Sequence, residues 1–410
     1  MTAAVEAPAT TPQRPYRNPT FLGWLAGYWL SLVGDQIYFI AFAFSAAQLG
    51  DPLLTSLVSM ASSIPRAVLM LFGGALGDRI GLRKLMLVSD AFRVLVMAVA
   101  ALAGLGGTSM WLLVGAALVF GAVDAAYMPA VTALPALILP GDQLPASVAA
   151  RQLANRGALL LGAPLGGLLV AVGGFPLACG VNAVSFALSV LILAKIRPQF
   201  ETRGVREAKP RRNLLAEVGD GLRYVIGQPV LRGVFLVLTT LEFCVTGPVN
   251  LAVPLRSVAE GWGATGQGWM LGALGVGGAG GALLVLLARK WTRPVTIGLW
   301  VMLVQAVGVV FVGYGPTLPA VCAAMVAIGA SGGVAGSLLA GSTQNLIPDG
   351  YRARVGSIFV LQGLGLVPVS FTLFGLLGTA VGVPAACAVC GVLIAASVAA
   401  AFTLPAIRRA

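Results

Sequence analysis

One short charged segment, placed between two long apolar runs, decides the fold of this chain. It reads Gly73-Gly74-Ala75-Leu76-Gly77-Asp78-Arg79-Ile80-Gly81-Leu82-Arg83-Lys84. The runs on either side, 53–76 and 85–106, are apolar, and a helix of about 20 such residues crosses the hydrocarbon core of a bilayer. We therefore expect a tight turn that joins two membrane-spanning helices and keeps its charges at the water interface.

The composition of the whole chain agrees with this reading. Of its 410 residues, 58% are hydrophobic and 10% are charged, whereas a soluble domain carries about 25% charged residues. The 54 glycines suit membrane helices, because small residues let such helices approach closely. The sequence thus predicts an integral membrane protein built of α-helices.

Further apolar segments of spanning length lie outward from the first turn, and most are separated by short Gly/Pro turns. Together they predict twelve transmembrane helices, at residues 20–46, 53–76, 85–106, 110–136, 152–172, 176–195, 231–254, 268–288, 294–313, 317–342, 356–381 and 383–405.

The positive charge fixes the expected orientation. The net charge is +12, but the basic residues lie in short gaps between apolar runs, which argues against nucleic-acid binding. With both termini on one side, most of the 26 Lys and Arg residues fall on that side, Arg256 falls on the other, and Arg66, Arg93 and Arg156 lie inside spans. The positive-inside rule makes this side the cytoplasm. We expect a multi-pass protein of the plasma (cell inner) membrane with both termini cytoplasmic and no cleavable signal peptide.

One connection is long, and two motifs recur. The connection is basic at first and then carries apolar side chains at helical spacing, which predicts a tether and an amphipathic helix on the inner membrane surface. Arg83-Lys84 recurs as Arg289-Lys290, and Pro140 with its neighbours recurs around Pro348. This internal repeat favours two six-helix bundles around a midplane cavity. The expected divisions are a disordered cytoplasmic N-terminus (1–19), an N-terminal bundle (20–195), the linker (196–230), a C-terminal bundle (231–405) and a cytoplasmic tail (406–410).

The segment quoted first resembles the signature loop of the major facilitator superfamily, Gly-x-x-x-Asp-Arg-x-Gly-Arg-Arg/Lys. The resemblance implies the major facilitator fold, and it implies that this loop is a latch that holds the two bundles together in one state. Leu82 departs from the pattern, because the family usually has Arg there. The latch residues are expected to be Gly74, Asp78, Arg79, Gly81 and Arg83.

A second stretch is similar to the antiporter motif of exporters, Gly-Pro-x-x-Gly-Gly, with its proline displaced by one position. It lies in the fifth span, where the matching residues are Gly162, Pro164 and Gly167. A glycine-rich packing face with a kink explains the same residues without export, and both readings stay open.

The whole chain also resembles the branch that contains macrolide-efflux and enterobactin-exporter proteins. The resemblance implies drug:proton antiport. It is carried by Ser31 to Asp35, Ser89 to Arg93, Pro129-Ala130 with Leu134-Pro135, and Gln344 with Pro348 and Arg354-Val355.

Ionisable residues inside membrane spans are costly, so each is a candidate for function. Asp35 and Glu242 occupy equivalent spans of the two halves, and we expect them to face one cavity and to bind protons or cations. Asp90 and Arg93 could neutralise each other, and Asp124 could pair with Arg93 or with Arg156. Asp124 and Arg93 therefore have either a structural or a coupling role.

Aromatic residues close to these carboxylates could line a cavity for an amphipathic substrate, or they could anchor the helices at the interface and in lipid. They are Tyr28, Trp29, Tyr38, Phe39, Tyr127 and Phe243.

Other kinds of site are poorly supported. The chain has no His, and the pair Cys387-x-x-Cys390 lacks a second pair, so we expect buried apolar cysteines and no metal. A nucleotide-binding loop of the Gly-x-x-x-x-Gly-Lys-Ser/Thr type is missing from the sequence. We expect neither an enzyme nor a cofactor.

The favoured function is secondary active transport by alternating access, as proton-coupled efflux of a small amphipathic drug, antibiotic or siderophore. The alternatives are a nutrient importer or symporter of the same fold and a non-transporting membrane sensor. The expected partners are a small-molecule substrate, protons and the lipid bilayer, and the protein is expected to act as a monomer.

Overall fold

The computed structural model describes residues 17–196, 214–288, 291–405 and 407. Within its helices, some side chains lie outside this description: 70–78, 214–218, 343–346, 349–350, 352–354, 357, 360 and 364. Residues 1–16 of the expected disordered N-terminus, most of the tether and the pair Arg289-Lys290 therefore fall outside the described residues.

The described residues are almost entirely helical. The amino-terminal helices are α1 (Pro19–Ala47), α2 (Pro52–Ile80), α3 (Leu82–Gly104), α4 (Met110–Ala133) and α5 (Leu144–Lys195). A linker helix, α6 (Leu214–Gly227), follows them. The carboxy-terminal helices are α7 (Pro229–Gly247), α8 (Val253–Ala259), α9 (Gly263–Leu287), α10 (Pro294–Tyr314), α11 (Leu318–Leu346), α12 (Asp349–Val381) and α13 (Val383–Phe402).

The spans number the predicted twelve. Eleven described helical stretches are long and apolar enough to cross a membrane. The longest of them, Gly141–Lys195, contains a break at Gly174, whose φ of 64° favours glycine. This break separates α5 into a first part (144–173) and a second part (175–195), which are two spans. Three helices begin at least five residues earlier than expected, because helical backbone continues past the apolar core into the interface; α5 starts at Leu144, α9 at Gly263 and α12 at Asp349.

Local sequence explains where the helices begin and turn. Asn18 caps α1, because its side-chain oxygen accepts hydrogen bonds from the backbone N–H groups of Thr20 and Phe21. Pro19 follows at the first helical position, where its missing N–H costs nothing. Gly81, between α2 and α3, has a φ of 88°, so the glycine of the signature loop provides the turn that the sequence predicts.

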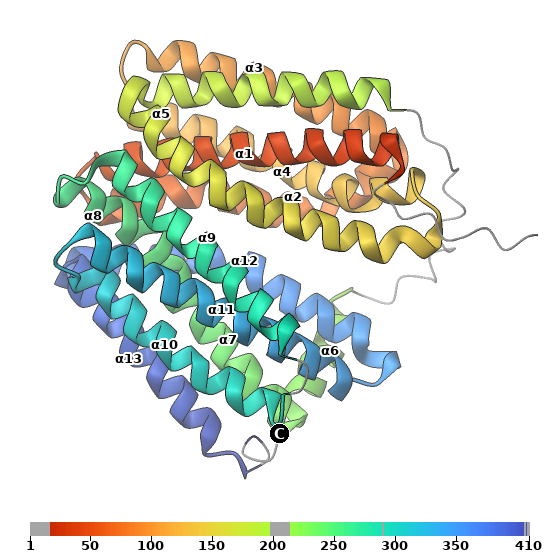
Figure 1. Cartoon of the computed structure of the whole chain (residues 1–410), viewed down its shortest axis with the longest axis vertical. Coiled ribbons are helices and arrows are strands. Elements are labelled where there is room, and N and C mark those ends of the chain that lie inside the picture. The colour runs from red at the N-terminus through yellow and green to blue at the C-terminus, as the bar shows by residue number, and fades with distance from the viewer. Residues whose placement is uncertain (1–16, 197–213, 289–290, 406, 408–410) are drawn as a thin grey trace, which may run out of the picture.

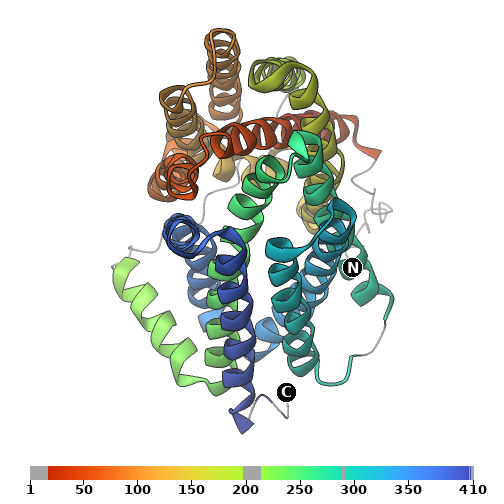
Figure 2. The ribbon, with the colours of Figure 1, turned by 90° about the vertical axis from the view of Figure 1, so that its left-hand side faces the viewer.

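The helices form two bundles that lie side by side. Figure 1 shows α1–α5 in the upper bundle and α7–α13 in the lower one, and Figure 2 shows the same division from the side. Large apolar side chains cover the outside, and Val172 and Leu286 are each 77% exposed. Such a surface suits a bilayer, and the protein is a multi-pass membrane protein.

The bundles meet at the end that carries the α1–α2 turn, here called the far end; the opposite end, which carries residues 196 and 214, is the linker end. At the far end Thr379 Oγ1 donates to Asp51 Oδ1 over 3.4 Å. The α-carbons of Gly167 in α5 and Gly268 in α9 approach so closely that a Cβ on either would lie 3.1 Å from the other. Figure 1 shows the bundles converging at the left and separating toward the right, where α6 lies.

The linker helix α6 packs on the carboxy-terminal bundle. The ring of Tyr224 stacks on Tyr351 of α12 with centroids 4.4 Å apart, and Val225 is fully buried. Leu222 and Ile226 stay exposed on a neighbouring face, as an amphipathic helix at a membrane surface requires.

The close approach at Gly167 gives a testable prediction. We expect Gly167→Leu to separate the bundles at the far end, because the new side chain would meet Ala264 and Gly268. Spin labels at Gln48 and Val381, both exposed at this end, should move apart by about 2 Å or more, which is the spread of ordinary helix–helix spacings. Gly180→Leu is the control, since a Cβ at Gly180 has no neighbour within 4 Å. Equal distances in both variants would contradict this packing.

Candidate functional site

A central cavity lies between the two bundles. Its volume is about 420 Å³, which is within the range of small-molecule sites. Its wall combines α1, α2, α4 and α5 with α7 and α12. The lining residues used below are Asp35, Gln36, Tyr38, Phe39, Phe42, Arg66, Phe120, Asp124, Asn155, Thr246, Asn250 and Phe371.

Asp35 brings a carboxylate into this cavity from the middle of α1. The preceding residue, Gly34, packs so tightly on Asn182 and Ser185 of α5 that a side chain there would overlap them. Packing of this face holds α1 in place and leaves Asp35 on the cavity side. The Oδ1 atom of Asp35 is buried and has no hydrogen-bond partner among the described residues, so the cavity contains a carboxylate oxygen that is free to accept a proton or a cationic group.

Asp124 is the second cavity carboxylate, and it is held by two arginines. Arg93 Nη2 lies 2.6 Å from Asp124 Oδ1, and Arg66 Nη2 lies 2.8 Å from Asp124 Oδ2. Of the two pairings considered from sequence, the structure thus has the one with Arg93 and not that with Arg156. Arg66 was missed as a site residue, although its charge inside an apolar span was a signal for it.

Arg93 is a buried cation beside the central cavity. It is 1% exposed, and its Nη1 lies 3.7 Å from Asp90 Oδ1. Its guanidinium carbon also lies 4.1 Å from the ring centroid of Tyr127 and 5.3 Å from that of Phe120. Two carboxylates and the faces of aromatic rings together replace the water that the cation loses.

The carboxy-terminal bundle contributes uncharged groups to the cavity. Thr246 and Asn250 line it from α7 and from the following π-helix, Pro248–Ala252. Glu242 is not among the lining residues; it lies one turn toward the linker end, where Thr246 Oγ1 donates to its Oε1 over 3.3 Å. Glu242 and Asp35 therefore reach the cavity differently, one through Thr246 and the other directly.

Aromatic rings cover much of the remaining wall. Of the aromatic residues named from sequence, Tyr38 and Phe39 line the cavity. Tyr28 and Tyr127 line a smaller cavity inside the amino-terminal bundle. Phe42, Phe120 and Phe371 were missed, because nothing in the sequence tells which apolar residues of a membrane helix face the interior and which face lipid.

Only part of the expected latch can be located. The side chains of Gly74 and Asp78 lie outside the described residues. Arg79 is exposed, whereas Arg83 Nη2 donates to the carbonyl oxygen of Ala194 over 2.7 Å. Arg83 thus caps the last turn of α5, where the negative end of the helix dipole stabilises a cation.

The antiporter-like residues lie where α5 touches two other helices. A Cβ at Gly162 would lie 2.7 Å from Gln36 Cβ of α1, whereas Gly167 faces Ala264 and Gly268 of α9. Pro164 packs on Gly272 of α9. This stretch is a close-packing face between the bundles.

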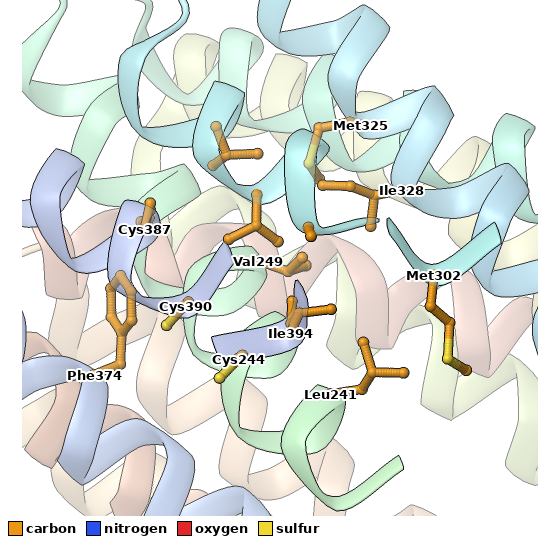
Figure 3. Close-up of a cluster of buried hydrophobic side chains, with 14 of the residues drawn as sticks. Leu241, Cys244, Val249, Met302, Met325, Ile328, Phe374, Cys387, Cys390 and Ile394 are labelled. Carbon is orange, nitrogen blue, oxygen red and sulfur yellow. The ribbon is translucent and has the colours of Figure 1, made fainter. Parts of the chain in front are cut away.

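The cysteines lie in apolar surroundings. Figure 3 shows Cys244 of α7 beside Cys390 of α13, with Cys387 one turn farther along α13 and Phe374 and Ile394 nearby. All five cysteines are free thiols. Among the described residues, no group of three His, Cys, Asp or Glu side chains could hold a metal ion.

Arg93 forms a cluster with Asp90, Asp124 and Arg66, here called the Arg93 cluster, and this cluster generates a stability prediction. We expect Asp124→Asn to lower the stability of the purified protein by roughly 3 kcal/mol, because it removes one partner of a buried ion pair. Thermal unfolding in detergent measures this effect, and Asp142→Asn, at an exposed position of the linker end, is the control. The double variant Asp124→Asn, Arg93→Gln should regain part of the loss. A double variant no more stable than Asp124→Asn alone would argue against the pairing.

Comparisons with known proteins show which proteins this chain is similar to. The multidrug efflux pump Tap of Mycolicibacterium fortuitum is 28% identical over 385 residues, which are 86% of this chain and 87% of Tap. A POT family transporter solved in complex with 5-aminolevulinic acid has a TM-score of 0.71 at 12% identity and covers 93% of this chain, as 96% of its own. A D-xylose-proton symporter has a TM-score of 0.68 at 14% identity, with coverage of 95% and 97%. At such identities the structures show a common fold alone.

The model of the Major Facilitator Superfamily matches residues 24–368. This range includes the signature loop, the Arg93 cluster and most of the lining of the central cavity. The chain therefore belongs to the Major Facilitator Superfamily and is a membrane transporter, not an enzyme.

Proposed function

We propose that this transporter exports a small amphipathic compound, such as a drug, antibiotic or siderophore, in exchange for protons. The observation that carries the proposal is the central cavity, where the unpartnered Asp35 carboxylate lies among aromatic rings. A carboxylate can hold either a proton or a cationic group, but not both at once. Competition for one site is the simplest way to exchange them.

The charge balance of the cavity supports a role for Asp35. Asp90 and Asp124 share Arg93, and Asp124 also binds Arg66. These two acids and two arginines neutralise each other and leave Asp35 as the unbalanced charge. Protonation or a bound cation would restore neutrality, which is strongly favoured where little water is present.

The wall of the cavity supports an amphipathic substrate. Phe39, Phe42, Phe120 and Phe371 offer apolar surface and ring faces, and amides and hydroxyls, such as those of Asn250 and Thr246, lie between them together with the charged side chains. Ring faces attract organic cations.

The direction of transport follows from orientation. The connections at the linker end carry most of the basic residues, so we infer that this end faces the cytoplasm. The bundles meet at the far end, and the state described here then has its outer side closed. The relationship to Tap, whose name is multidrug efflux pump, supports export.

The orientation is testable by labelling. In a background without the five native cysteines, we expect a membrane-impermeant maleimide to label Gln48→Cys in intact cells and Asp142→Cys only after lysis. Both positions are exposed, one at each end. Labelling of Asp142→Cys in intact cells would reverse the orientation and the export proposal with it.

The function is testable in everted vesicles. With an imposed proton gradient and a broad panel of amphipathic compounds, the wild type should accumulate at least one compound. Asp35→Asn should lower this accumulation about a hundredfold, as removal of a positioned proton carrier does. Glu242→Gln should have a smaller effect, since Glu242 acts only through Thr246.

Two further variants sharpen the result. Asp142→Asn removes an exposed carboxylate and should behave as wild type, whereas Asp35→Glu keeps the carboxyl group and should retain part of the activity. Full proton-driven accumulation by Asp35→Asn would exclude Asp35 from the mechanism. Accumulation of none of the compounds by the wild type would count against the antiporter, and growth on a scarce solute that depends on this chain would favour an importer.

A further inference from the structure

A small cavity inside the amino-terminal bundle lies beside the Arg93 cluster and apart from the central cavity. Its volume is about 10 Å³, which is room for about one water molecule. It is lined by α1, α3, α4 and the second part of α5. The lining residues used here are Trp24, Tyr28, Tyr127, Ser189, Leu193 and Ile196.

The lining offers what a buried water molecule requires. Trp24 and Tyr127 are each 2% exposed, and the indole Nε1 and the phenol oxygen have no hydrogen-bond partner among the described residues. A buried polar group without a partner costs about 1–3 kcal/mol. A water molecule that binds both of these groups and the hydroxyl of Ser189 would remove this cost.

Ser189 connects the small cavity to a carboxylate. Its hydroxyl donates to Asp90 Oδ2 over 2.9 Å, and Asp90 is 0% exposed. The other oxygen, Oδ1, has no hydrogen-bond partner among the described residues, although Arg93 Nη1 lies 3.7 Å away. Asp90 thus has one carboxylate oxygen without a hydrogen-bond partner, and the hydroxyl of Ser189 connects its other oxygen to the small cavity.

The small cavity reaches close to the linker end. Leu193 and Ile196 are the residues of its wall at the end of α5, and Lys195 between them ends that helix and is exposed. The small cavity therefore ends among the buried side chains of the last turn of α5, close to the interface at this end.

Arg93 stands between the two cavities. Its Nη1 faces Asp90, and its Nη2 binds Asp124, which lines the central cavity. A second link joins Tyr28 of the small cavity to Asn155 of the central one, over 3.3 Å from Asn155 Nδ2 to the phenol oxygen.

We propose that Asp90 is a second proton-binding residue, which exchanges its proton with the linker end through a water molecule in the small cavity and through Ser189. The proposal rests on the proton-coupled function proposed above. In one transfer, the O–H bond of Ser189 breaks as its proton binds Asp90 Oδ2, and the Ser189 oxygen takes a replacement proton from the water molecule. The water molecule is in turn reprotonated from the linker end, so one proton moves inward and each intermediate group returns to its starting form.

The groups around Asp90 explain how such a proton would act on the substrate site. They are Arg93 on its own helix, Ser189 on α5, Tyr127 and Asp124 on α4, and Tyr28 and Asp35 on α1. Once Asp90 is neutral, Arg93 is left to Asp124 alone, and Asp124 then holds Arg66 less tightly. The side chain of Arg66 is 44% exposed, so its release changes the charge that a substrate meets in the central cavity.

Proton and substrate would thus be coupled without sharing a site. The coupling is reciprocal, because a substrate that draws Arg66 away from Asp124 also strengthens the pull of Asp124 on Arg93 and so favours protonation of Asp90. Asp35 competes directly for protons and cations, whereas Asp90 acts at a distance through one arginine.

The proposal is testable without a known substrate. Infrared difference spectra of the purified transporter in liposomes, recorded during a pH titration, report protonated carboxyl groups by their C=O stretch. We expect one carboxyl band to vanish in Asp90→Asn, and a different band to vanish in Asp35→Asn. An unchanged set of carboxyl bands in Asp90→Asn would overturn the proposal.

The route is tested by a matched pair of serines. Ser189 and Ser185 lie one turn apart on α5 and are each 5% exposed, but Ser185 hydrogen-bonds only within its own turn, to Asn182. After transfer to D₂O, the Asp90 band should shift about tenfold or more slowly in Ser189→Ala than in wild type, since a positioned proton carrier contributes about a hundredfold. Ser185→Ala should exchange at the wild-type rate. Equal exchange rates in the two serine variants would overturn the route.

These outcomes are separate from those of the proposed function. If the wild type moves no compound in vesicles but shows the Asp90 band, the antiport proposal is contradicted and the proposal that Asp90 binds a proton is supported. If the wild type exports compounds but Asp90→Asn keeps every carboxyl band, the antiport proposal is supported and the proposal that Asp90 binds a proton is overturned. Because Asp90→Asn also disturbs an ion pair, a monodisperse gel-filtration profile is required before its spectrum is compared, and Ser189→Ala tests the route with the pair intact.

Discussion

The amino-terminal half of this transporter depends on the pairing of one arginine. Arg93 is 1% exposed inside a bundle that faces hydrocarbon, where an unpaired charge would cost several kcal/mol. Asp124 at 2.6 Å and Asp90 at 3.7 Å meet that need, and the rings of Tyr127, Phe120 and Phe186 enclose the rest of the guanidinium. Because two acids share one cation, any proton on either acid redistributes the pairing. Burial therefore forces Arg93 to pair with both acids, and for the same reason the pairing changes when either acid is protonated.

The two bundles contribute different chemistry to the central cavity. The charged groups that line it among the described residues, Asp35, Asp124 and Arg66, all come from the amino-terminal bundle. The carboxy-terminal bundle contributes Thr246, Asn250 and apolar side chains, and its own cluster around Cys244 and Cys390 is apolar (Figure 3). The ionisable groups of the cavity wall are thus concentrated in one bundle, and the other offers a neutral surface to the cavity.

The sequence was sufficient for the fold, because in a bilayer the length and apolarity of a segment determine whether it spans. It also identified Asp35, Asp124 and Arg93 as unusual, since charge inside a span is visible in the letters alone. It did not reveal that Asp124 binds Arg66, or that Glu242 reaches the cavity only through Thr246, because the rotation of each helix is set by its neighbours and lipid leaves no polar–apolar pattern to read. Phe42, Phe120 and Phe371 were hidden for the same reason. Ser189 was hidden because a buried serine in a membrane helix most often bonds its own backbone, as Ser185 does.

The packing of α5 connects the chemistry of the cavity to the movement of the bundles. On one side Gly162 and Gly166 let α1 approach, so that Gln36 and Ile37 lie directly on the α5 backbone next to Asp35. On the other side Gly167 and Pro164 lie on Gly268 and Gly272 of α9. Interiors packed this closely transmit displacement and do not absorb it. A change of charge at Asp35 that shifts α1 by a fraction of an ångström is therefore felt across α5 at the seam with α9. The glycine-rich stretch is thus a close-packing face toward α1 and α9. Its reading as an exporter motif stays a prediction, for which tight packing would be the physical means.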